Sequence, residues 1–152
     1  MADRNVYPVN LESFAKLVEG SGYTLHTADE ERGRLTLDIR GEEAVLRLHV
    51  IIGKSPDGDS VWYTRFLSYA LDFEPIKAGV DRGALLEWLN RKNADLLFGR
   101  YYYDEGTDTV AFEASIPCNG GVLGEDFDDL LRIATISVDR SHVDLKALVK
   151  AA

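Results

Sequence analysis

The chain has 152 residues, 45% of them hydrophobic and 28% charged, which is typical of one globular domain. Its 26 acidic and 17 basic residues give a net charge of −9, which disfavours direct binding to a nucleic-acid backbone. The apolar runs are too short to cross a bilayer, the N-terminus is too polar for a signal peptide, and the single cysteine excludes an internal disulfide. We therefore expect one cytoplasmic domain spanning residues 1–152, without membrane contact.

The first half of the chain predicts one helix and then an antiparallel meander. Asn10 is a suitable cap for a helix over about residues 11–19, where apolar residues recur at helical spacing. Alternating and β-rich stretches predict strands over residues 23–28, 34–39, 44–52 and 61–73. Residues 53–60, dense in glycine, proline and aspartate, predict the turn before the last of these strands.

The second half predicts a helix, a hairpin and a final helix. Asp81 is a plausible cap for a helix that ends near Asn93, and strands over residues 97–103 and 109–116 flank an acidic turn. The last helix starts near Glu125, whose carboxylate suits the positive end of the helix dipole, and its apolar pattern extends into a second segment. The predicted fold class is α+β: an antiparallel sheet with helices in the order α-β-β-β(-β)-α-β-β-α.

The sequence holds no constellation of side chains that commits the protein to a reaction. None of the three histidines has a second ligand at i+2 or i+4, the spacing that zinc sites commonly use. Cys118 precedes the last helix, but no established base or oxyanion arrangement accompanies it. The acidic residues 125–129 and the Asp57-Gly58-Asp59 turn do not follow the calcium-loop pattern. We therefore predict a protein that is not an enzyme, with no catalytic residues, no metal and no cofactor.

Three consecutive tyrosines beside an arginine are the most interesting candidate for a binding surface. Strand alternation places Tyr101 and Tyr103 on one face, and Tyr102 on the other face with Phe98 and Arg100. Three interpretations follow: a packed hairpin, an aromatic protein–protein surface, or a platform for single-stranded nucleic acid. The acidic residues of the strands and the turn argue against nucleic acid, so packing or a protein interface is favoured.

Several short motifs around this hairpin occur in a recognisable order. The first is the helix segment Leu-Leu-Glu-Trp-Leu-Asn over residues 85–90, followed by Asn93. The next is Phe-Gly-Arg-Tyr-Tyr-Tyr-Asp over residues 98–104. The last two are Val-Ala-Phe-Glu-Ala-Ser-Ile over residues 110–116 and Gly-Gly at residues 120–121. In this order and spacing the chain resembles the YbjN family, best over residues 82–140. That bacterial family is similar in fold to class I type III secretion chaperones and has been labelled a sensory-transduction regulator.

The resemblance implies an α+β domain that forms a homodimer and acts through protein contacts without catalysis. It offers no catalytic residues to carry over to this chain. We therefore predict an adaptor or chaperone-like regulator of a stress or regulatory pathway that binds another protein. Trp88, Tyr101 and Tyr103 are expected to contribute to a subunit or partner interface. The alternative is a small-ligand sensor with a pocket between sheet and helices, near Trp62 and Trp88.

Overall fold

The computed structural model describes residues 5–43, 45–54, 62–69, 76–118 and 120–151, with the backbone alone for residues 54, 62, 63 and 67–69. The elements in chain order are β1 (Val6–Tyr7), α1 (Leu11–Gly20), β2 (Thr24–Asp29), β3 (Arg34–Arg40), β4 (Val45–Lys54), β5 (Trp62–Tyr69), α2 (Arg82–Asp95), β6 (Arg100–Asp104), β7 (Thr109–Pro117), β8 (Val122–Leu123) and α3 (Gly124–Ala151). The predicted α+β class and the predicted order of helices and main strands are confirmed.

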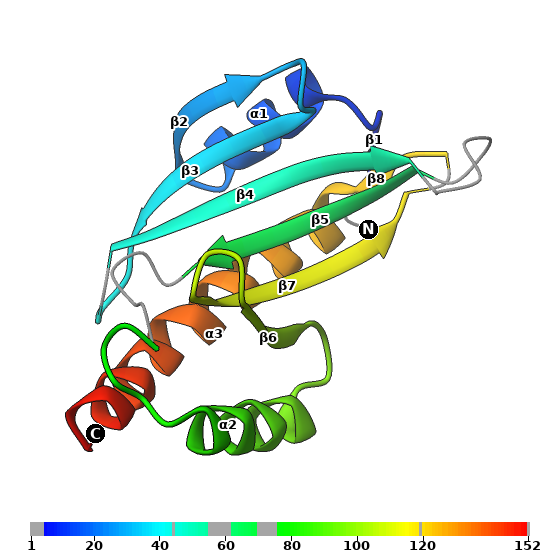
Figure 1. Cartoon of the computed structure of the whole chain (residues 1–152). Coiled ribbons are helices and arrows are strands. Elements are labelled where there is room, and N and C mark those ends of the chain that lie inside the picture. The colour runs from blue at the N-terminus through cyan, green and yellow to red at the C-terminus, as the bar shows by residue number, and fades with distance from the viewer. Residues whose placement is uncertain (1–4, 44, 55–61, 70–75, 119, 152) are drawn as a thin grey trace.

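One antiparallel sheet organises the domain, with its strands in the order β2-β3-β4-β5-β7-β6. The strands from β2 to β5 pair with their neighbours in the chain, β7 then pairs with β5, and β6 forms the far edge. Figure 1 shows α3 crossing behind the middle strands, α1 behind β2 and β3, and α2 beside β6. The described helices therefore leave the face towards the viewer uncovered, and the core must lie on the other face.

The core fills the space between the sheet and the helices α1 and α3. Alternate strand residues point into it, such as Leu37 in β3, Leu48 in β4 and Phe112 in β7, each at most 1% exposed. At its centre, Phe127 of α3 packs against Phe14 of α1 with ring centroids 4.9 Å apart. The apolar stripes of helices and strands thus form one continuous cluster.

Both predicted helix caps are confirmed. Asn10 Oδ1 accepts a hydrogen bond from the Ser13 amide at 2.8 Å, and Asp81 Oδ1 accepts one from the Ala84 amide at 2.9 Å. Each bond satisfies one of the amides that a helix leaves without an internal partner, so these residues define where α1 and α2 begin.

The strand expected from Leu97 begins only at Arg100, so that prediction is wrong at its start. Gly99 has a φ of +81°, which interrupts the extended backbone before the strand. Phe98 therefore does not share a strand face with Tyr102, contrary to the sequence prediction. Of the strand expected over residues 61–73, residue 61 and residues 70–73 lie outside the described part.

The final helix is one continuous element, whereas the sequence suggested two segments. Its buried stripe continues through Val138 and Leu145, so the same side faces the core along its length. The sequence does not predict the short antiparallel pair β1–β8, because each of these strands has two residues and shows no periodic pattern. No described helix, α3 included, combines the length and the apolarity that crossing a membrane requires.

Candidate interaction groove

An apolar groove of about 530 Å³ lies beside the first half of α3. Its walls come from α3, from the end of β7, from β8 and from the segment that leads into β6. The lining residues are Phe98, Ile116, Pro117, Gly121, Val122, Leu123, Asp126, Asp129, Leu130 and Ile133. The volume falls in the range of ligand and peptide sites, which are mostly apolar clefts with a few polar groups.

Phe98 reaches the groove because the chain turns at Gly99. A Cβ atom at Gly99 would lie 2.5 Å from Cζ of Phe112 and 2.7 Å from the Glu113 carbonyl oxygen. Only glycine therefore allows this close approach to β7. The turn leaves Phe98 60% exposed and its neighbour Leu97 92% exposed. Two large apolar side chains in water beside an apolar groove are typical of an interaction site.

The charged residues among the described lining of the groove are Asp126 and Asp129, and both are acidic. Both side chains are exposed and stand in the first turns of α3, where carboxylates also favour the helix dipole. Asp129 forms an ion pair with Arg132 at 2.9 Å, with both side chains more than 60% exposed. Such an exposed pair is weak, so the groove keeps an acidic rim.

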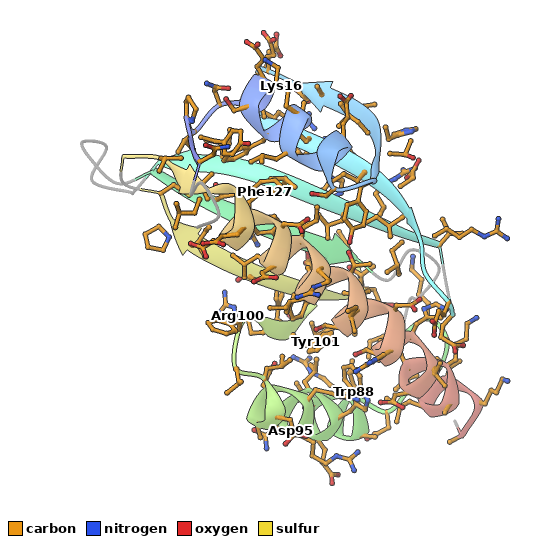
Figure 2. The ribbon with its side chains drawn as sticks, turned by 180° about the vertical axis from the view of Figure 1, so that it is seen from behind. Lys16, Trp88, Asp95, Arg100, Tyr101 and Phe127 are labelled. Carbon is orange, nitrogen blue, oxygen red and sulfur yellow. The ribbon has the colours of Figure 1, made fainter. Side chains whose placement is uncertain are left out.

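Two of the three residues predicted to form an interface, Trp88 and Tyr101, lie in the core of the single chain. Each is 5% exposed, and their rings meet edge to face with centroids 5.5 Å apart. The Tyr101 hydroxyl donates to the Ser137 carbonyl at 2.7 Å and lies 2.5 Å from Ser141 Oγ. Burial raises the pKa of Tyr101 to about 12. Figure 2 shows both rings between α2 and α3, so they connect α2, β6 and α3.

Asn93, the conspicuous asparagine of the sequence motif, holds the same region together. Its Oδ1 accepts from the Tyr101 amide at 2.7 Å, and its Nδ2 donates to the Tyr101 carbonyl at 3.0 Å. Because β6 is an edge strand, this side chain takes the place of a neighbouring strand at one residue. The segment that carries Phe98 is thus anchored on both sides, by Asn93 before it and Tyr101 after it.

Tyr103, the third predicted interface residue, is partly buried at the end of β6. Its hydroxyl donates to Asp108 Oδ1 at 2.6 Å, and this hydrogen bond raises the pKa of Tyr103 to about 12. Asp108 also accepts hydrogen bonds from the amides of Ile76 and Lys77. Tyr103 and Asp108 thus connect the β6–β7 hairpin to residues 76–77, which precede α2, and neither lines the groove.

The predicted division of the three tyrosine rings between two sheet faces is confirmed. Tyr101 faces the core, whereas the Tyr102 hydroxyl accepts from Arg65 at 3.1 Å on the uncovered face. Arg65 and Arg100 both bind the carboxylate of Glu113 there. This side of the hairpin is therefore a network of ion pairs beside one aromatic ring.

Among the described titratable groups, His26 Nδ1 lies 3.0 Å from Asp38 Oδ2, with side chains 47% and 36% exposed. The described residues contain no cluster of three or more histidine, cysteine, aspartate or glutamate side chains placed to hold a metal ion. His49 contacts Thr36 at 3.0 Å, and burial together with the charges of Arg34 and Arg47 lowers its pKa to about 4. Cys118 is 1% exposed, with its sulfur 3.1 Å from the Thr64 hydroxyl. The thiol of Cys118 is therefore shielded from solvent.

The fold is an α+β domain with an apolar groove on the helical side of one antiparallel sheet. Residues 10–142 match the family model of YbjN, described as "Putative bacterial sensory transduction regulator", and the chain belongs to this family. The family description thus names a regulator and no class of enzyme.

Among solved structures, the chain is similar to YbjN from E. coli, described as "a putative transcription regulator". The TM-score is 0.59 at 15% sequence identity, and the match covers 94% of this chain and 96% of that chain. At this identity the similarity shows the fold alone. No curated protein matches the sequence.

Proposed function

We propose that this protein is a non-catalytic, cytoplasmic regulator that acts as an adaptor or chaperone-like homodimer and binds another protein through the groove. The observation that carries the proposal is the apolar groove beside α3, with exposed Phe98 in its lining and exposed Leu97 next to Phe98 in the chain. The family description as a regulator and the resemblance to secretion chaperones support a protein partner, and the net charge of −9 disfavours a nucleic acid.

The exposed side chains supply part of the binding free energy that a specific contact needs. Complete coverage of Leu97 and Phe98 by a partner contributes roughly 2–4 kcal/mol, since burial of one such side chain is worth about 1.5–3 kcal/mol. Half-buried residues such as Ile116 and Ile133 enlarge the surface. A cluster of this kind, centred on an aromatic residue, is typical of the few positions that dominate protein–protein affinity.

Trp88, Tyr101 and Tyr103 act indirectly in this proposal. They hold α2, β6 and the hairpin in place, and so position the segment that presents Phe98 to a partner. Tyr101→Phe and Tyr103→Ala remove parts of this support. If both variants fold, dimerise and capture partners like the unmodified chain, the two tyrosines have no such role.

A matched pair of substitutions on α3 tests the groove. Ile133 lines it, whereas Ile136, one turn further on, is 42% exposed and lies outside it. Affinity capture from the native cytoplasm, read by mass spectrometry, should lose its specific partners with Ile133→Asp and keep them with Ile136→Asp. Equal capture by both variants, each shown to be folded by circular dichroism, contradicts the proposal.

The homodimer is tested separately by light scattering. A dimer has twice the 16.9 kDa mass of the chain. A monomer mass across the micromolar range contradicts this part of the proposal and leaves partner binding to the preceding test.

A small-ligand sensor is the second candidate, because the groove volume also suits a metabolite. The pocket expected between sheet and helices near Trp62 and Trp88 is a different place from the groove, since Trp88 packs in the core and does not line the groove. The Trp62 side chain lies outside the described residues. A thermal-shift screen tests this reading: saturable stabilisation by a metabolite, lost with Ile133→Asp, supports it over a protein partner.

A further inference from the structure

We infer that the segment bound in the groove is cationic: a short peptide stretch of the partner in which apolar side chains are flanked by lysine or arginine. The inference rests on the proposed function and specifies the partner that the groove selects. It follows from the arrangement of apolar and charged residues around the groove.

The floor of the groove sets the first requirement, which is apolar side chains. Leu130, Val122 and Ile133 are buried or half-buried, and they line the groove together with Phe98. A charged or strongly polar side chain placed against this surface would lose its hydration without gaining hydrogen-bond partners. The bound segment therefore has to present apolar groups to the floor.

The rim sets the second requirement, which is positive charge. Asp126 and Asp129 stand on the α3 side of the groove, and the described lining residues include no lysine or arginine. Arg132, the partner of Asp129, has a 65% exposed side chain and is not part of the lining. Rim charges beside an apolar surface are less screened than charges in bulk water, so they attract cations and repel anions.

The same charges disfavour a second copy of this chain as the occupant. A two-fold interface centred on the groove would bring the Asp126 and Asp129 pairs of two chains close together. A cationic segment of a different protein satisfies both the floor and the rim.

The experiment uses the full chain and labelled synthetic peptides of about 16 residues. The first peptide has leucines at helical spacing and lysines elsewhere, the second has glutamates in place of the lysines, and the third has the lysines with the leucines scrambled. Fluorescence anisotropy at low salt measures each Kd. We expect the first peptide to bind and the other two to bind at least tenfold more weakly.

Two double variants of α3 provide the matched control. Asp126→Asn with Asp129→Asn removes two rim charges, whereas Glu125→Gln with Asp128→Asn removes two charges from the same turns on the side that faces α1. The first variant should weaken binding of the lysine peptide about fivefold, and the second should leave it within twofold. Both double variants remove two carboxylates from the positive end of the helix dipole, so their effects on helix stability should be similar. A difference in peptide affinity between them therefore reports the charges at the groove.

The outcomes separate the two proposals. Equal binding of the lysine and glutamate peptides, abolished by Ile133→Asp, overturns the cationic preference and keeps the groove as a binding site. Equal effects of the two double variants also overturn the preference. Binding of the lysine peptide that Ile133→Asp does not affect overturns both proposals, because attraction to the acidic chain then explains it. A change from dimer to monomer in Ile133→Asp, without peptide binding, assigns the groove to the homodimer and overturns the inference.

Discussion

Replacement of Asn93 by alanine tests how the edge of the sheet is completed. Asn93 lies on α2 and forms two hydrogen bonds with the backbone of Tyr101 in the edge strand β6, at 2.7 Å and 3.0 Å. Alanine removes both at once and creates no clash. We predict that Asn93→Ala lowers the free energy of unfolding by about 1–3 kcal/mol, since each hydrogen bond contributes about 0.5–1.5 kcal/mol net.

Two features of the site limit the size of this effect. Asn93 is exposed, so water can reach the freed amide and carbonyl groups and offset part of the loss. Alanine also favours the helix over asparagine by about 0.5 kcal/mol. Asn90→Ala is the matched control, because Asn90 is exposed on the same helix and gains the same propensity. The difference between the two variants therefore isolates the contacts with Tyr101.

Urea denaturation followed by circular dichroism measures the difference, and a melting temperature lowered by roughly 3–10 °C should accompany it. The stability of Asn93→Asp should fall between those of Asn93→Ala and Asn90→Ala. An aspartate carboxylate still accepts a hydrogen bond from the Tyr101 amide but cannot donate one to the Tyr101 carbonyl. If Asn93→Ala and Asn90→Ala unfold at the same urea concentration, the side chain does not stabilise the edge and the reasoning is wrong.

Three further predictions concern the glycine turn, a histidine and a buried hydroxyl. Gly99→Ala should destabilise the fold by about 2–4 kcal/mol in urea unfolding, because φ is positive and the new Cβ would lie 2.5 Å from Phe112 Cζ. Gly20→Ala is the control and should be neutral or stabilising, since nothing lies within 4 Å of its new Cβ. His49 has a folded pKa of about 4, below its ordinary 6.5, so the unfolded chain binds the proton first. Stability should therefore fall as the pH drops from 6.5 towards 4, by about 1–2 kcal/mol because solvent reaches the half-buried ring, and His49→Gln should remove this part of the pH profile. Tyr101→Phe should cost about 1–2 kcal/mol in thermal or urea unfolding, since α3 loses its hydrogen bonds to this hydroxyl; an unchanged midpoint contradicts that role.

The main helices and strands could be predicted from local pattern because each has a strong one. In β3, Leu35, Leu37 and Ile39 alternate with polar residues, and all three are buried on one face. Asn10 and Asp81 are polar residues placed just before apolar periodicity, and both cap helices. These signals depend on neighbours within a few residues, so they do not require knowledge of the tertiary structure.

The groove could not be predicted in the same way. Phe98 and Ile133 approach it from segments far apart in the chain, and β7 and β8 supply the remaining wall. Phe98 lines the groove because the backbone turns at Gly99, which has a positive φ. The run of aromatic residues after Gly99 favoured a longer strand at the level of sequence and so did not indicate this turn. The sequence could have indicated the turn, since Leu97-Phe98-Gly99 places glycine directly after two large apolar residues.

The aromatic residues were also ambiguous at the level of sequence. Trp88 and Tyr101 are the residue types that dominate protein interfaces, and they are equally suited to a core. Tyr101 lies in the core because its hydroxyl reaches Ser137, a residue on a helix much later in the chain. That contact depends on where α3 crosses the sheet, which no local pattern specifies.

The position of α3 in the chain has a consequence for synthesis of the protein. This helix covers the middle of the sheet, and it follows every strand in the sequence. During translation, the apolar sides of β4, β5 and β7 are complete while their cover is still inside the ribosome. Packing of these strands therefore waits until α3 has emerged, and a nascent chain that stops before Gly124 exposes a surface that general chaperones recognise.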